Sequence, residues 1–415
     1  MLRGGDYLRL QSRAIMGDVQ SQSQDHPADA ILPGYRRSVF LFCVTNFLFW
    51  ATLYLYVPIL PVYAQALGAS LSMVGLIVAS YSMPQLLLRI PIGVLFDATT
   101  RRKLLIAIEI LMTLFGALGL GLAPHPWSLF FARALTGVGA AGWVIFSVYL
   151  TGYYPPASMK KAIGLINFVQ GAALVVATLS GGLIAEKFGS KYTFWGAALL
   201  GIVALVPLLL AKQPAIARVE RFSWRCFLAV ATRPLLLVAS FLAILTQFAN
   251  WAGLFGFVPV YATQIGASKA DLGIITTLAL ASSAVASLGV VWLINRCGNS
   301  FTIFLASILT GFSIAVVPFV QDVSLLQAVM VLNGLGRGLT MTAFMILSVQ
   351  AVEPQNRATA MGVYQAAYSI GMVSGPLVSG FLADSIGLTS VFYVSAALCG
   401  LMAALAFLPI LRKKQ

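Results

Sequence analysis

Residues 61–77 read PVYAQALGASLSMVGLI, and residues 259–275 read PVYATQIGASKADLGII. The two stretches are identical at nine of seventeen positions and lie 198 residues apart. A second pair of stretches, GLIAEKFGSKYTFW at 182–195 and GFLADSIGLTSVFY at 380–393, matches at the same separation and aligns Glu186 with Asp384. A shared membrane-like composition does not explain a common register. We therefore infer that the second half of the chain repeats the first.

The composition is that of a membrane protein, because 60% of the 415 residues are hydrophobic and only 9% are charged. A helix of about 20 apolar residues, with a rise of 1.5 Å per residue, crosses the hydrocarbon core of a bilayer. The alternating pattern of membrane barrel strands is absent. The sequence therefore predicts an all-α integral membrane protein with twelve transmembrane helices, at 38–60, 73–95, 104–123, 127–150, 162–184, 192–211, 235–258, 272–294, 302–320, 325–350, 359–381 and 390–411.

Each repeat contains six predicted spans, and an even number of spans returns the chain to the same side of the membrane. The halves are therefore expected to be parallel repeats related by a pseudo-two-fold axis along the membrane normal. Two bundles that rock against each other around a site at their interface form the layout of a transporter. The predicted divisions are a disordered cytoplasmic tail at 1–35, a six-helix bundle at 36–211, a cytoplasmic linker at 212–234, a second six-helix bundle at 235–411 and a basic cytoplasmic tail at 412–415.

The net charge of +14 is explained by topology. If both termini are cytoplasmic, twenty Lys and Arg residues fall on inner segments, and only Lys187, Lys191 and Lys269 fall on outer loops. Such a bias is the positive-inside rule. We therefore expect a multi-pass protein of the plasma or inner membrane with both termini in the cytoplasm, and no nucleic-acid partner.

The stretch GVLFDATTRRK at 93–103 concentrates charge between the second and third spans. It resembles the loop motif of the major facilitator superfamily, although Ala98 and Thr100 depart from the family pattern. The resemblance implies a conformational switch, in which a carboxylate pairs with cations or helix ends in one state and releases them in another. Three cations alone would be explained by positive-inside anchoring. The matching residues are Gly93, expected to allow close helix approach, and Asp97, Arg101 and Arg102.

Two further motifs extend the resemblance over nearly the whole chain, from about 36 to 411. With the loop motif, these motifs in spans four and eleven resemble those of the twelve-helix drug/metabolite:proton antiporter branch of the family. The Gly-Pro pair that this branch has in span five is replaced here by Ala177 and Thr178. The matching residues are Arg133, Gly137 and Gly139 in span four, and Gly371, Gly375 and Pro376 in span eleven, where the resemblance implies close helix packing.

Four charges lie inside predicted spans, and each requires a reason because a charge at the bilayer centre costs at least roughly 2.5–3.5 kcal/mol. Arg89 and Glu109 lie at similar depth on neighbouring spans, so we expect an ion pair. Alternatively, Glu109 carries a proton. The resemblance also assigns proton coupling to Arg133, with Asp97 as a further candidate. Arg337, near the midplane of span ten, is the candidate to contact an anionic substrate.

The remaining candidates describe an apolar chamber with a few polar groups, which suits amphipathic molecules. In the family that the chain resembles, spans one, four, seven and ten line the cavity. The predicted cavity residues are Asn46, Trp50, Tyr54, Gln247, Asn250, Trp251, Asn333, Arg337, Gln365 and Tyr368.

An enzyme is disfavoured, because no span holds a His, a Cys pair or two acidic residues. The sequence has no P-loop, and its four cysteines lack metal spacing, so neither a cofactor nor a metal is expected. The leading hypothesis is a monomeric secondary active transporter that exports small amphipathic drugs or metabolites in exchange for protons. The alternative is a proton-coupled importer of an organic anion, or a lipid-linked flippase of the same fold.

Overall fold

The computed structural model describes residues 31–214, 224–353 and 356–412. The predicted tails therefore lie mostly outside the described residues, as does the middle of the predicted linker, of which Trp224–Ala231 forms a short helix, α11. The first half contains α2 (Arg36–Tyr54), α3 (Leu60–Ala66), α4 (Leu71–Ser80), α5 (Ser82–Ala98), α6 (Arg102–Leu122), α7 (Pro126–Ala140), α8 (Trp143–Thr151), α9 (Met159–Phe188) and α10 (Ser190–Leu210). The second half contains α12 (Pro234–Ala252), α13 (Val258–Gln264), α14 (Lys269–Val316), α15 (Val323–Gln350), α16 (Arg357–Ile386), α17 (Thr389–Leu405) and α18 (Pro409–Arg412).

The twelve predicted spans are confirmed. Within the described ranges, ten helical segments are long and apolar enough to cross a membrane, and the shorter helix Thr389–Leu405 adds one more. One of the ten, Lys269–Phe319, holds two spans, because α14 is broken at Gly298. Gly298 has a φ of 83°, a left-handed conformation that residues with a Cβ rarely adopt. The chain is a multi-pass membrane protein.

The repeat seen in the sequence is also present in the backbone. Gly189 and Gly387, which lie 198 residues apart, join consecutive spans with φ angles of 103° and 97°. Ser70 and Ser268, at the same separation, are both N-caps whose side chains accept a backbone N–H three residues later. These local matches follow from the aligned residues, so each half builds the same six-helix bundle.

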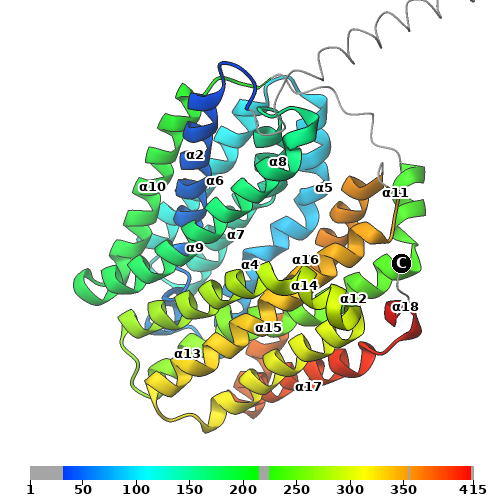
Figure 1. The fold of residues 1–415 in the computed structure, drawn as a ribbon. Coiled ribbons are helices and arrows are strands. Elements are labelled where there is room, and N and C mark those ends of the chain that lie inside the picture. Colours follow the sequence, from blue (N-terminus) through cyan, green and yellow to red (C-terminus); the bar gives the residue numbers. More distant parts are fainter. Residues whose placement is uncertain (1–30, 215–223, 354–355, 413–415) are drawn as a thin grey trace, which may run out of the picture.

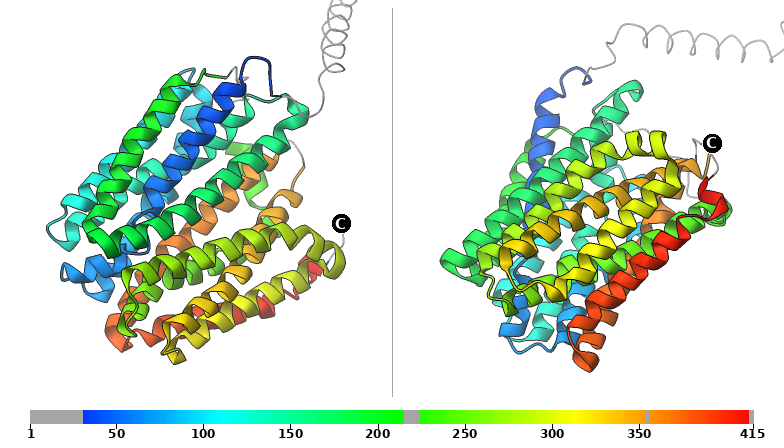
Figure 2. Two further views of the ribbon diagram at one scale, coloured as in Figure 1. Left: turned by 60° about the vertical axis from the view of Figure 1, so that its left-hand side comes forward. Right: turned by 60° about the horizontal axis from the view of Figure 1, so that its bottom comes forward.

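The most extensive packing between the two bundles involves two pairs of helices, α9 with α14 and α4 with α16 (Figure 1), and α5 also contacts α16. The views in Figure 2 agree that α9 and α14 run side by side. We call the end of the molecule that carries α11, α18 and the start of α2 the linker end. The other end, where α9 meets the start of α14 and α16 meets the start of α4, is called the opposite end.

Candidate functional site

Aromatic rings from both bundles meet at the interface between them. The rings of Tyr81 and Trp251 stack with centroids 5.5 Å apart and an interplanar angle of 18°. Tyr54 contacts Phe255 edge to face, with centroids 6.2 Å apart. Since such pairs join residues of different halves, they hold the bundles together in this state. We call the set the aromatic interface cluster; it consists of Trp50, Tyr54, Tyr81, Trp143, Trp251 and Phe255.

Two arginines lie against this cluster, one from each bundle. The Arg133 guanidinium lies 4.2 Å from the centroid of the Tyr81 ring and donates a 2.8 Å hydrogen bond to the hydroxyl of Tyr56. The Arg337 guanidinium lies 5.8 Å from the centroid of Phe255 and donates to the Ser283 hydroxyl at 3.2 Å. Each cation is therefore placed by an aromatic face and a hydroxyl.

Arg89 crosses the interface directly, from α5 to α16. It donates to the backbone carbonyl of Gln365 at 2.9 Å, to the Ser369 hydroxyl at 3.2 Å and to the Gln85 side chain at 2.7 Å. Its guanidinium also lies 5.4 Å from the centroid of the Tyr368 ring. Every one of these partners is neutral.

The expected ion pair between Arg89 and Glu109 is wrong. Glu109 is only 5% exposed, and neither of its carboxylate oxygens has a hydrogen-bond partner among the described residues. The side chain lies against Gly142, at the break between α7 and α8, where a Cβ would collide with the carboxylate. Arg89 points across to α16 of the other bundle, so the two side chains lie in different parts of the structure and do not pair.

The five predicted cavity amides are buried, at 5% exposure or less, and each has at least one amide atom without a partner among the described residues. Gln247 and Asn250 lie on α12 beside Trp251. Asn46 donates a hydrogen bond to the Ile166 carbonyl of its own bundle at 3.4 Å. Asn333 donates to the Ser313 hydroxyl at 3.1 Å, inside the second bundle, so the structure turns it toward α14. The remaining amide is Gln365.

The loop motif at the linker end makes contacts within the first bundle. Arg102 is buried and donates from Nε to the Phe96 carbonyl at 3.2 Å. Arg101 is exposed in the turn before α6. No atom of another helix in the described ranges lies within 4 Å of where a side chain at Gly93 would begin, so the expected close helix approach is absent in this state. The side chain of Asp97, at the end of α5, is outside what the structure describes.

The glycines singled out in spans four and eleven lie against neighbouring backbones. A Cβ at Gly139 would lie 2.5 Å from the Glu109 carbonyl oxygen, and Gly137 contacts the Tyr81 carbonyl. Gly371 and Gly375 face the backbone of α12, and the Pro376 carbonyl contacts Gly75 across the bundle interface. Absence of side chains at these positions allows the helices to approach closely.

Four aromatic residues of the site were missed by reasoning from sequence: Tyr56, Tyr81, Trp143 and Phe255. Phe255 had a usable signal, because it follows Trp251 by four residues and therefore shares its helix face. The other three had none, since an aromatic residue in an apolar span is most often a packing residue.

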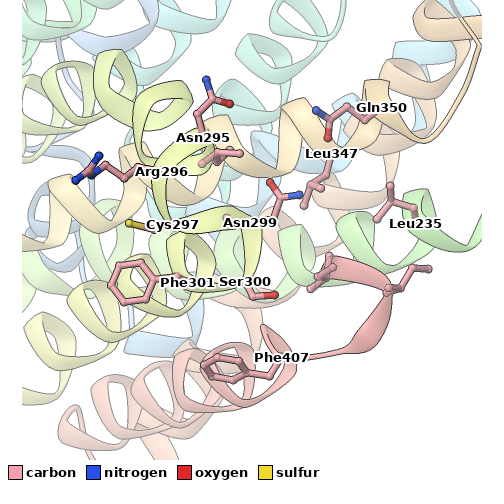
Figure 3. Close-up of a pocket in the computed structure, with 14 residues that line it drawn as sticks. Leu235, Asn295, Arg296, Cys297, Asn299, Ser300, Phe301, Leu347, Gln350 and Phe407 are labelled. Carbon is pink, nitrogen blue, oxygen red and sulfur yellow. The ribbon is translucent and has the colours of Figure 1, made fainter. Parts of the chain in front are cut away.

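A separate cavity of about 940 Å³ lies at the linker end of the second bundle (Figure 3). Its wall includes Asn299 and Ser300 beyond the α14 break, together with Leu235, Leu347 and Phe407. None of the residues predicted for the substrate cavity lines it. The aromatic interface cluster and its arginines therefore remain the candidate substrate site.

Curated transporters resemble the chain over most of its length. It is 26% identical over 408 residues to the purine ribonucleoside efflux pump NepI of Escherichia coli O127:H6, covering 94% of this chain and 98% of NepI. It is 26% identical over 369 residues to a multi-drug resistance efflux pump PmrA homologue of Lactococcus lactis, covering 85% of this chain and 89% of that protein.

Solved structures share the fold. The nucleoside transporter NupG superposes with a TM-score of 0.76 at 14% identity, covering 91% of this chain and 100% of NupG. A bacterial homologue of the lysosomal transporter Spinster gives a TM-score of 0.75 at 17% identity, covering 89% of this chain and 95% of that one. The family model described as Major Facilitator Superfamily matches residues 42–266 and 240–415. The chain therefore belongs to the Major Facilitator Superfamily, and it is a membrane transporter.

Proposed function

We propose that the protein is an alternating-access exporter of small amphipathic, ring-containing compounds, driven by protons. The observation that carries the proposal is the aromatic interface cluster, where rings from both bundles surround cationic and amide groups. Rings recognise flat apolar parts of a substrate, and polar atoms without partners recognise its hydrogen-bonding groups. The relatives that are named as efflux pumps for purine ribonucleosides and for multiple drugs support this substrate class.

The orientation of the protein in the membrane follows from the distribution of its positively charged residues. The positive-inside rule favours the cytoplasm for the linker end, and hence for both termini. Because the bundles are packed together at the opposite end, we infer that this state is the inward-facing one. The Spinster homologue with a similar fold was solved in an inward-facing, occupied conformation. An exporter collects its substrate from the cytoplasm in such a state, and we expect the protein to work in the plasma or inner membrane as a monomer.

Glu109 is the proposed proton carrier. A buried carboxylate without a hydrogen-bond partner is far more stable neutral than charged. It therefore holds a proton in this state and releases it when a conformational change brings water or a cation to it. Its contact with Gly142 links it to the break between α7 and α8, so a rearrangement of span four would reach it directly.

Efflux from cells tests the proposal. Cells expressing the protein are loaded with ethidium or with a purine ribonucleoside, and extrusion is followed with and without a protonophore. We expect extrusion to stop when the protonophore is added. In Glu109→Gln, the rate of extrusion should be at least about ten-fold lower than in the parent. The control is Asp322→Asn, which retains an N-cap at the opposite end of the molecule. Extrusion by Glu109→Gln at the parental, protonophore-sensitive rate would exclude Glu109 as the carrier.

A second candidate function is the proton-coupled import of an organic anion, or the flipping of an anionic lipid-linked molecule. It is favoured by the three arginines that lie at the bundle interface, Arg89, Arg133 and Arg337, because the hydrogen-bond partners that the described residues give them are neutral. An anionic ligand would balance this charge. In Arg337→Gln, import of benzoate would be lost, whereas a neutral ribonucleoside would still be carried. Equal loss of both compounds would contradict a role of Arg337 in anion binding.

A further inference from the structure

Four carboxylates of the described chain lie at the opposite end, and each accepts a hydrogen bond from the first turn of a helix. Two of them serve their own helices. Asp271 accepts from the Ser268 N–H at 3.0 Å, and Asp322 accepts from the Leu325 N–H at 2.8 Å. These are ordinary caps, because the first N–H groups of a helix have no partner within the helix.

The other two carboxylates cap a helix of the opposite bundle. Glu186, in the last turn of α9, accepts from the Lys269 N–H at the start of α14 at 2.9 Å. Asp384, near the end of α16, accepts from the N–H groups of Leu71 and Ser72 at the start of α4, at 3.0 and 2.7 Å. Each contact combines hydrogen bonds with the favourable interaction between a negative charge and a helix N-terminus.

The two crossing caps are one contact made twice by the repeat. Glu186 and Asp384 are 198 residues apart, and so are Leu71 and Lys269. Directly behind the caps lie two glycine pairs with the same relation: a Cβ at Gly182 would lie 2.7 Å from the Gly273 Cα, and a Cβ at Gly380 would lie 3.1 Å from the Gly75 Cα. The glycines bring the helices together, and the carboxylates then reach the helix starts.

We propose that Glu186 and Asp384 are gate residues that hold the opposite end closed. The inference rests on the alternating access of the proposed function. Opening this end separates α9 from α14 and α4 from α16, so both caps must break and the freed N–H groups must turn to water. Among the described residues, the hydrogen bonds of these carboxylates go to Leu71, Ser72 and Lys269, and none of these belongs to the candidate substrate site. They act on transport by setting how often the opposite end opens.

The reporter for the test is Thr277→Cys in a cysteine-free background. The Thr277 hydroxyl lies 2.8 Å from that of Thr178, so the position is at the contact between α14 and α9. Right-side-out vesicles are treated with a membrane-impermeant maleimide, and the labelling rate is measured without substrate or a pH gradient. Glu186→Ala and Asp384→Ala are exposed changes at helix ends and leave the bundle cores untouched.

We expect each single variant to raise the labelling rate about five-fold, as the loss of one helix cap ordinarily shifts a two-state equilibrium. The double variant should raise it about 25-fold, because the caps join different helix pairs. Asp322→Ala is the matched control: it also removes a cap at this end, but one within a single bundle, so it should leave the rate unchanged.

A double variant that is labelled at the parental rate, or an equal increase in Asp322→Ala, would overturn the gate assignment. Because the labelling needs neither substrate nor protons, an error in the proposed substrate class or in the role of Glu109 leaves it unaffected. Conversely, the parent protein could fail to extrude ethidium while the labelling rate still rises when the caps are removed. That result would contradict the proposed export function and support the assignment of Glu186 and Asp384 as gate residues.

Discussion

Replacing Gly273 by Ala should open the opposite end of the transporter. A Cβ at Gly273 would lie 2.8 Å from the Gly182 Cα and 2.8 Å from the Thr178 carbonyl oxygen. Carbon atoms in contact prefer separations of roughly 3.5–4.0 Å, so α14 and α9 must separate by about 1 Å at this point. Overpacking of this kind costs about 1–3 kcal/mol. The cost falls only on the closed state, so the ratio of closed to open molecules should fall roughly 5- to 150-fold.

Spin labels at positions 188 and 386 provide the assay. Phe188 and Ile386 are 58% and 70% exposed at equivalent ends of α9 and α16, and they belong to different bundles. Double electron–electron resonance measures the distance between the two spin labels. In Gly273→Ala it should show the parental distance and an additional population at a longer distance. The matched control is Gly289→Ala on the same helix, where no atom of a neighbouring helix in the described ranges lies within 4 Å of the added Cβ. A distance distribution in Gly273→Ala identical to the parent, or an equal shift in Gly289→Ala, would refute the reasoning.

Three further outcomes are expected. Gly142→Ala should abolish proton-driven efflux at normal expression, because its Cβ displaces the Glu109 carboxylate; wild-type efflux would contradict the assigned contact. Lys103→Ala should lower the free energy of unfolding by about 0.3–1 kcal/mol in a detergent melt, because Lys103 Nζ donates to two carbonyls at the end of α10. Trp251→Ala should weaken binding of ring-containing substrates about two- to ten-fold in a displacement assay, whereas exposed Trp292→Ala should not.

The fold could be predicted almost completely from the sequence. Span length follows from the thickness of the bilayer, and the register of the repeat fixed the number of bundles and their relation. The division of α14 into two spans was predicted as well: the polar stretch at 295–300 separates the predicted spans 272–294 and 302–320, and the helix is broken within it at Gly298.

The site could be predicted only in part, because sequence gives the depth of a residue in a span but not the face it occupies in the assembled bundle. Arg89 and Glu109 lie at similar depth, and pairing them was reasonable on that basis. In the structure Arg89 points to α16, and Glu109 points to the notch at Gly142. Asn333 likewise has the expected depth, but it bonds to Ser313 inside its own bundle.

Contacts between the halves were beyond the reach of a single sequence. The repeat aligned Glu186 with Asp384 and so marked both residues as a repeated feature. It did not reveal that each carboxylate reaches a helix start in the other bundle, because that depends on how the bundles dock. The stacking of Tyr81 on Trp251 was hidden for the same reason.

Proton movement coupled to substrate movement tests the central claim most directly. The purified protein is placed in liposomes that contain a pH-sensitive dye, and the compound that the efflux panel identifies is added on one side. We predict that the parent moves protons opposite to the substrate, and that Glu109→Gln exchanges substrate without moving protons. Proton movement by Glu109→Gln at the parental ratio to substrate would contradict the account.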